Sequence, residues 1–315
     1  LVTGVQTCAL PIWEIQSGAD KGDPQAQNAL GTLLLLGKGI PQDCPAAARW
    51  FRKAADQGLS EAQYNLGLME YTGRGIPRDW AEAAKWFRLA ADQGNSMAQL
   101  NLGLMCQEGQ GLAQNFEAAA EWFRKAADKG NSAAQLNLGL LYQDGKGVPK
   151  DMNLALKWFQ TSADIGNAEA QVALGALHER GAGVPRDPKA AVDWFRKAAD
   201  QGNSDGQYNL GLMYYAGKGV APDLAAAAEW FLAAEQGHSL AEYNLGVMYF
   251  QGRGVAANPA EAAKWQQRSA EHGYAEAQFS LAALYDQGRG VAKDRAAAAR
   301  WYRAAAEQGH AAAAF

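Results

Sequence analysis

Apolar and small residues follow a helical spacing that recurs along most of the chain. In residues 60–94, Ala62, Leu66 and Met69 fall on one side of a helix at 100° per residue. A second stripe has the i, i+3, i+4, i+7, i+8 spacing of an amphipathic helix and consists of Ala83, Trp86, Phe87, Ala90 and Ala91. The pattern predicts one helix from about Glu61 to Thr72 and a second that begins after Asp79.

The same pattern returns every 36 residues. Gly67 lies in the middle of the first helix, and a glycine holds this place in seven units. A glycine inside a helix costs about 1 kcal/mol relative to alanine, so we expect a neighbouring helix to approach there too closely for a Cβ. The tryptophans of the second stripe are Trp50, Trp86, Trp122, Trp158, Trp194, Trp230, Trp265 and Trp301. We expect this column to lie in the core.

Turn and cap residues mark the boundaries of every unit. Each first helix is followed by Gly-x-Gly, as at Gly73 and Gly75, which predicts a left-handed residue at the helix end. The central residue is mostly basic, as at Arg74, and we expect it to favour the negative end of the helix dipole. The second helices all begin after an N-cap residue: Asp43, Asp79, Asn115, Asp151, Asp187, Asp223, Asn258 and Asp294.

One helical hairpin cannot bury its apolar faces alone, whereas a stack of hairpins buries a continuous core. The sequence therefore predicts an all-α fold, a right-handed α/α superhelical solenoid of eight 36-residue helix-turn-helix repeats.

Residues 134–166 carry the pattern A-x-x-x-LG-x-x-Y-x-x-G-x-G-V-x-x-D-x-x-x-A-x-x-W, followed by a small pair and a final glycine. This pattern resembles the Sel1-like repeat, a relative of the tetratricopeptide repeat. The resemblance covers the chain from about residue 18 to the end. It implies a bacterial-type scaffold or adaptor without catalytic activity, whose first helices line a concave groove that binds a protein or peptide.

Several segments depart from the period. The unit around Trp230 is one residue short, so we expect a local irregularity near Leu232–Gly237. Residues 1–12 fit nothing in the array and read like a translated sequencing adapter, an artefact to be set aside. We expect 13–22 to be the remnant of a preceding repeat, 23–309 to hold the eight repeats, and 310–315 to begin a truncated ninth. The chain would then be a fragment.

Composition excludes some classes of function. The net charge is −4, without a basic stripe interleaved with aromatics, which disfavours nucleic-acid binding. No apolar run is long enough to predict a membrane span. Cys44 and Cys106 occupy different repeat positions, so a disulfide is not expected, and few cysteines suit cytoplasm and periplasm alike.

Candidate catalytic and metal-binding motifs give no coherent site. The Gly-x-Gly loops follow helices, whereas a phosphate-binding loop follows a strand. The histidines lack partners at zinc-ligand spacing, and we expect His238, His272 and His310 to face solvent at the turns between units. We predict no cofactor, no metal and no enzymatic activity.

Two sets of residues on the first helices are candidates for partner binding. The first is an asparagine ladder: Asn65, Asn101, Asn137, Asn209 and Asn244. Its amides could hydrogen-bond a neighbouring unit. Alternatively, as the resemblance to tetratricopeptide repeats implies, they could grip the backbone of an extended peptide.

The second candidate set is aromatic and lies on the variable face of the first helices: Tyr64, Tyr71, Tyr208, Tyr215, Tyr243 and Phe250. It could form an anchor for a partner, since exposed aromatics are enriched at binding hot spots. It could also be ordinary packing between adjacent first helices.

The leading functional hypothesis is thus a scaffold that binds a protein or peptide in its groove. Two alternatives stay open at this point: an envelope-associated hydrolase or ligand-binding protein of the same fold, related to β-lactam binding, and a spacer segment of a larger protein. The β-lactam alternative is weakened because this chain lacks the regular cysteine pair that some relatives carry in each unit.

Overall fold

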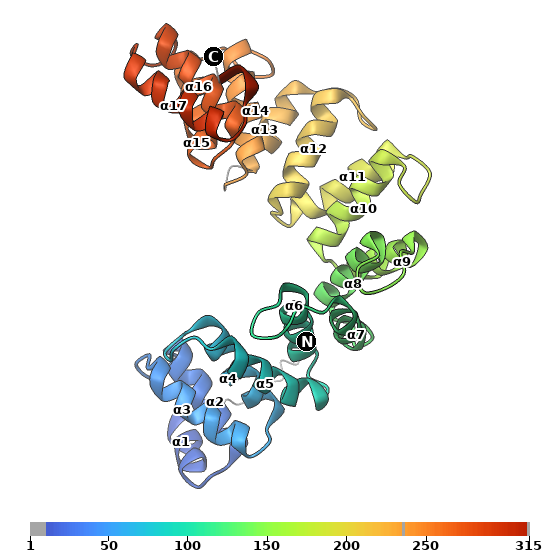
Figure 1. The fold of residues 1–315 in the computed structure, drawn as a ribbon, viewed down its shortest axis with the longest axis vertical. Helices are drawn as coiled ribbons and strands as arrows, with labels where there is room; N and C mark the ends of the chain where they lie inside the picture. The colour runs from blue at the N-terminus through green and yellow to red at the C-terminus, as the bar shows by residue number, and fades with distance from the viewer. Residues whose placement is uncertain (1–10, 235–236, 314–315) are drawn as a thin grey trace, which may run out of the picture. The chain divides into compact units, whose positions relative to one another are not determined.

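The computed structural model describes residues 11–234 and 237–313, and the chain divides into two compact units, residues 1–158 and 159–315. All regular elements of the described residues are helical (Figure 1). The first helices of the repeats are α2 (Pro24–Leu36), α4 (Ser60–Thr72), α6 (Ser96–Glu108), α8 (Ser132–Asp144), α10 (Ala168–Arg180), α12 (Ser204–Ala216), α14 (Ser239–Gln251) and α16 (Ala275–Gln287). The second helices are α3 (Cys44–Asp56), α5 (Trp80–Asp92), α7 (Phe116–Ala127), α9 (Met152–Asp164), α11 (Pro188–Asp200), α13 (Leu224–Ala233), α15 (Pro259–Glu271) and α17 (Arg295–Glu307).

Within each unit, each helix packs against the one that follows it. In the first unit the contacts run from α1 (Ile12–Asp20) through α8, and in the second from α10 through α17. Both kinds of contact recur, within a repeat and between successive repeats. The predicted all-α helical solenoid is confirmed.

Asparagine and aspartate fix where the second helices begin. In all eight repeats the side chain of the predicted N-cap accepts a hydrogen bond from a backbone N–H of the first helical turn. Asp79, for example, accepts from the Glu82 N–H at 3.0 Å. An exposed N–H at each helix start is thereby satisfied, and the prediction from sequence is confirmed.

Close packing explains why glycine recurs at two positions of the repeat. A Cβ on Gly67 would lie 2.9 Å from the ring of Phe87 in the second helix of the same repeat. Gly75 has a φ of +78°, and a Cβ there would lie 2.5 Å from the Cβ of Cys44, at the start of the preceding second helix. The first contact confirms the predicted close approach of helices at the mid-helix glycine.

Phenylalanine, rather than tryptophan, forms the centre of each repeat. Phe87 is fully buried, whereas the adjacent Trp86 is only partly buried. The same difference holds in most repeats, although Trp122 and Trp265 are buried. The expectation that the whole tryptophan column lies in the core is therefore wrong. Phenylalanine points at the mid-helix glycine, and tryptophan lies 100° further round the helix at the edge of the stripe.

The short repeat ends its second helix early. Helix α13 has 10 residues, whereas α11 and α15 have 13. Its C-cap is Ala234, which donates a backbone hydrogen bond to the Trp230 carbonyl at 3.1 Å. The predicted irregularity is confirmed as far as Ala234, while residues 235–236 lie outside the described residues.

The proposed domain boundaries stay predictions. Of the segment assigned to an artefact, residues 1–10 lie outside the described residues, and Ile12 begins α1. Its side chain approaches Gly39, where a Cβ would lie 2.6 Å from Ile12 Cδ1. At the other end, η1 (Ala311–Ala313) is a single 3-10 turn after the last repeat, and residues 314–315 are not described.

Candidate partner-binding surface

The predicted asparagine ladder makes hydrogen bonds between successive repeats. Asn65 Nδ2 donates to Asn28 Oδ1 at 2.9 Å. Such bonds, here called rungs, also join Asn101 to the Tyr64 hydroxyl and Asn244 to the Tyr208 hydroxyl. Each rung connects the first helix of one repeat to the first helix of the next.

The neighbouring residue decides whether a rung forms. For Asn137 and Asn209, the partner position on the preceding first helix is held by Leu100 and Val172, which have no polar side-chain group. Asn137 Nδ2 instead donates to the Ala133 carbonyl on its own helix at 2.8 Å. Asn209 bonds the carbonyl four residues before it in the same way, also at 2.8 Å. All five amides thus have a partner within the chain.

The tyrosines of the rungs are half-buried. Burial raises the pKa of Tyr64, Tyr208 and Tyr243 above the ordinary value of 10.0, and a hydrogen bond from a side chain of the next repeat partly offsets this. For Tyr243 that side chain is Ser280, which stands in the asparagine column of the last repeat. The phenols therefore stay protonated at neutral pH and serve as structural hydrogen-bonding groups.

In five repeats the residue in the middle of the Gly-x-Gly loop reaches back to the preceding repeat. The Tyr71 hydroxyl donates to Gln110 Oε1 at 2.6 Å, and Lys218 Nζ lies 2.8 Å from Glu179 Oε1. Arg74 donates to the Leu35 carbonyl at 3.0 Å, near the end of the preceding first helix. These contacts, here called loop clasps, show that the loop cations bind across repeats.

Two loop clasps in the second unit pair arginine with an aromatic ring. Arg253 lies over the Tyr215 ring, 4.8 Å from its centroid, and donates to the Tyr215 hydroxyl at 2.5 Å. Arg289 lies 4.6 Å from the centroid of Phe250. Both aromatic side chains remain partly exposed beside their arginines. Tyr215 and Phe250 therefore belong to a surface of alternating rings and cations.

The remaining predicted aromatics pack at the turns between repeats. Tyr208 stacks on His238 with ring centroids 4.4 Å apart, and Tyr243 meets Tyr274 edge-on at 5.2 Å. The structure thus places Tyr208 and Tyr243 in successive seams between repeats, away from the clasps.

Two of the three turn histidines are covered. The side chains of His238 and His310 are 12% and 13% exposed, and His310 stacks on Phe279 at 4.5 Å. His272 is 44% exposed. The expectation of solvent-facing histidines is wrong for His238 and His310, because an aromatic residue on the adjacent first helix covers each ring.

A column of buried glutamines was missed by the sequence analysis. Gln171 Nε2 donates to the Ala163 carbonyl of the preceding second helix at 3.1 Å, and its Oε1 accepts from Gln201 at 2.8 Å. Equivalent carbonyl bonds are made by Gln27, Gln63, Gln99, Gln135, Gln207 and Gln278. The signal was present, because a glutamine recurs at the same step in seven first helices.

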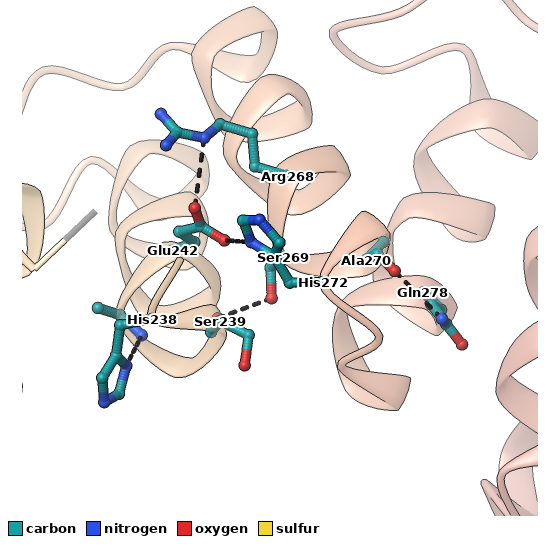
Figure 2. Close-up of polar contacts among 9 residues, drawn as sticks. His238, Ser239, Glu242, Arg268, Ser269, Ala270, His272 and Gln278 are labelled. Carbon is teal, nitrogen blue, oxygen red and sulfur yellow. Dashed lines mark hydrogen bonds and ion pairs between the residues drawn. The ribbon is translucent and has the colours of Figure 1, made fainter. Parts of the chain in front are cut away.

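The seventh repeat replaces this glutamine pair with a glutamate and a histidine, as Figure 2 shows. Glu242 occupies the glutamine column, and its side chain is fully buried. Its carboxylate lies 2.7 Å from His272 Nδ1 and 3.3 Å from Arg268 Nε. His272 stands where Gln201 stands in the fifth repeat, so both members of the pair are replaced together.

A buried serine lies beside this cluster. The nearby Ser269 is fully buried, and its hydroxyl donates to the Ser239 carbonyl at 2.7 Å (Figure 2). The hydroxyl is thus directed to a backbone acceptor, whereas a serine nucleophile needs an adjacent base. Among the described residues, no group of three or more histidines, cysteines and carboxylates is placed to hold a metal ion.

A second buried carboxylate lies in the first unit. Glu70 is 3% exposed and accepts from Arg52 at 2.6 Å. Burial raises the pKa of Glu70 above its ordinary value, and the Arg52 guanidinium opposes the shift. Later repeats place tyrosine here: Arg196 donates to the Tyr214 hydroxyl at 2.6 Å. Glu70 is thus the partner of an arginine on the preceding second helix.

Cys44 and Cys106 are both free, as the sequence predicted. In the described part of the chain, no helix combines the length and the apolar character that crossing a membrane requires.

The paired helices, the glycine contacts and the repeated rungs define a helical repeat protein. The Sel1 repeat model matches residues 24–59, 60–95, 96–131, 132–167, 168–203, 204–238, 239–274 and 275–310. The chain belongs to the Sel1 repeat family. Sel1 repeats are typically non-catalytic modules of protein interaction, and proteins built from them often serve as scaffolds.

Solved structures of similar proteins have the same fold. The chain is similar to c5321, a protective antigen present in uropathogenic Escherichia coli strains displaying an SLR fold: 39% identity, TM-score 0.80, covering 97% of this chain and 66% of that one. It is also similar to a Sel1 repeat protein from Oxalobacter formigenes, with 33% identity and a TM-score of 0.76 over 96% of this chain and 89% of that one.

A more distant likeness is to yeast Tom70, with 16% identity and a TM-score of 0.51 over 95% of this chain and 58% of that one. It shows the fold alone. No curated protein matches the chain. The chain thus spans about two thirds of the length of the antigen and most of the length of the Oxalobacter protein.

Proposed function

We propose that the chain is a scaffold that binds a protein or peptide partner along its first helices and performs no chemistry itself. The glycines, caps, phenylalanines and glutamines recur because they build the repeats. The outer columns of the first helices vary from repeat to repeat, as expected of a surface adapted to a particular partner.

The observation that carries the proposal is the surface of rings and cations in the second unit. Tyr215 with Arg253 and Phe250 with Arg289 present aromatic and guanidinium groups side by side and partly exposed. Tyrosine, tryptophan and arginine are the residue types most enriched at interface hot spots. The asparagine ladder supports the array and is a weaker candidate, because its amides already have partners.

Capture of partners by the purified protein tests the proposal. Bait carrying Tyr215→Ala and Phe250→Ala should lose at least about tenfold of a specifically captured partner, since hot-spot truncations cost about 2 kcal/mol or more. The control bait carries Asp193→Ala and Glu229→Ala, two exposed positions on the second helices. Equal loss with both baits, or undiminished capture by the aromatic variant, would remove this surface from the function.

A further inference from the structure

The loop clasps of the second unit differ in whether their cation is neutralised. In the sixth repeat, Lys218 Nζ lies 2.8 Å from Glu179 Oε1, so the clasp itself supplies the opposite charge. In the next two clasps, Tyr215 and Phe250 hold the position of Glu179, and an arginine lies over each ring. A ring face attracts a cation but has no net charge. These two clasps therefore leave two positive charges on the surface.

Both guanidinium groups keep most of their hydrogen-bonding capacity. Arg253 donates one side-chain hydrogen bond, to the Tyr215 hydroxyl, whereas Arg289 makes none within the part of the chain that the structure describes. Neither arginine forms an ion pair with a described carboxylate. A guanidinium has five N–H donors in a planar fork that matches a carboxylate. Both side chains are exposed, so the unused donors face solvent.

The carboxylates on the same first helices are directed elsewhere. Burial and, to a smaller extent, the charge of Asp286 raise the pKa of Tyr302 in α17, so this carboxylate lies beside the following second helix. Asp205 and Glu276 lie at the N-terminal ends of their helices, where each pairs with a turn histidine. The two clasp arginines lie past the opposite, C-terminal ends and are left without an opposite charge.

An apolar hollow adjoins each of these two clasps. The larger hollow measures about 350 Å³, and its lining includes Val247, Phe250, Phe279 and Arg289. The smaller one measures about 100 Å³ and is lined in part by Tyr215 and Val247. Val247 of α14 contributes to both hollows, so the two adjoin along this helix. The surface thus offers apolar space next to each unneutralised guanidinium.

We propose that the surface of rings and cations binds an acidic segment of a protein partner that carries apolar side chains among its carboxylates; this rests on the proposed scaffold function. Carboxylates pair with Arg253 and Arg289, and apolar side chains enter the hollows beside the rings. The rings already hold the guanidinium groups in place, so pairing costs less side-chain entropy. An extended polyanion such as nucleic acid fits less well, because the chain carries a net charge of −4.

Peptides of matched shape test the charge requirement. Three blocked, fluorescently labelled heptapeptides alternate leucine with aspartate, asparagine or lysine, and their binding to the full chain is followed by anisotropy. At low salt we expect the aspartate peptide to bind at least about fivefold more tightly than the asparagine peptide, as two exposed ion pairs allow, and the lysine peptide to bind least. This preference should shrink in about 1 M salt, where the screening length is about 3 Å. Equal binding of the aspartate and asparagine peptides, or no binding of either, would overturn the proposal.

Charge-removing variants locate the preference on the surface. Arg253→Gln combined with Arg289→Gln should abolish the preference for the aspartate peptide. Arg295→Gln combined with Arg300→Gln makes the same change of charge at two exposed positions of α17 and should keep it. Thermal unfolding verifies that both double variants are folded. A preference that survives in the first variant, or disappears in both, would contradict the assignment to these arginines.

A carboxylate introduced into one clasp provides a second test. Phe250→Glu copies Glu179 and should neutralise Arg289 within the chain, which lowers the preference for the aspartate peptide. Phe250→Gln copies Gln143, which holds this position in the fourth repeat, and removes the ring without adding charge. It should bind both peptides more weakly but keep the preference. Equal preferences in the two variants would show that Arg289 does not pair with the peptide.

The outcomes separate this proposal from the scaffold function. If the peptides bind alike while Tyr215→Ala with Phe250→Ala still reduces partner capture, the acidic partner is wrong and the scaffold function stands. If the arginines confer the aspartate preference while the aromatic variant captures normally, acidic recognition stands and the proposed aromatic anchor fails. A short oligothymidine that binds more tightly than the aspartate peptide, through the same arginines, would assign the surface to nucleic acid and overturn the proposal.

Discussion

At the scale of single residues, different repeats place different side chains at the same repeat position. Glu70 and its equivalent Tyr214, in a later repeat, illustrate this. Both pair with an arginine of the preceding second helix. The tyrosine does so as a neutral group, whereas Glu70 brings a charge into the interior. Its Oε2 is buried and has no hydrogen-bond partner among the described residues.

We therefore predict that Glu70→Tyr stabilises the protein at neutral pH, by about 1–4 kcal/mol, as replacement of buried ion pairs often does. The sign follows from linkage. Because the pKa of Glu70 is raised in the folded state, its ionisation costs stability as pH rises from its ordinary value of 4.5 through the raised value. The gain should therefore shrink as pH falls below that range.

Urea unfolding of both proteins between pH 4 and pH 8 measures this difference. Glu61→Gln, at an exposed carboxylate in the same repeat, controls for the general loss of negative charge. A gain that grows on acidification, or a variant less stable than the wild type at pH 7, would show that the Arg52 pair outweighs the cost of burial.

At the scale of the helix, much could be predicted from sequence because local rules decide it. The N-caps and the helix ends depend on one residue and its near neighbours, and the mid-helix glycine pointed to a close helix contact because it recurs despite its cost to the helix. The phenylalanine–tryptophan assignment failed because adjacent residues on a helix both fall within an apolar stripe of about 100° or more. Only the approach of α4 to α5 at Gly67 shows that Phe87 points to the centre.

Hydrogen bonds from the asparagine ladder to a neighbouring repeat were one of two expectations from sequence, but the particular partners of the rungs and the loop clasps were out of reach. They join residues 36 to 39 positions apart, and their partners depend on how one repeat is set upon the next. A periodic sequence supplies the columns but does not specify the offset between them. Thus Arg74 looked like a helix-dipole residue within its own repeat, although it reaches the carbonyl of Leu35.

We predict that Phe87→Ala destabilises the chain by about 3–5 kcal/mol, the range for deletion of a buried aromatic side chain, and that Trp86→Ala costs less. Phe87 is fully buried, whereas Trp86 is partly exposed and loses fewer contacts. Thermal unfolding of both variants measures the order. A larger loss of stability for Trp86→Ala would show that the tryptophan column belongs to the core after all.

At the scale of the whole molecule, the repeats differ in how well they follow their own pattern. The stability of a repeat array is close to a sum of repeat terms and nearest-neighbour interfaces, so local departures weaken particular repeats. Three departures fall close together in sequence: α13 is short, Glu242 places a fully buried carboxyl group in the glutamine column, and Gln266 replaces a core phenylalanine.

We therefore expect α14 and α15 to open more readily than α10 and α11, whose repeat keeps the glutamine pair and the phenylalanine. Hydrogen exchange followed by mass spectrometry on the intact chain should show protection in α14 and α15 lower by at least about tenfold, which corresponds to 1.4 kcal/mol of local stability. Gln266→Phe should restore part of this protection, and Gln267→Phe should not. Equal protection in the two repeats would mean that the Glu242–His272 pair and the neighbouring interfaces fully offset the loss of the phenylalanine.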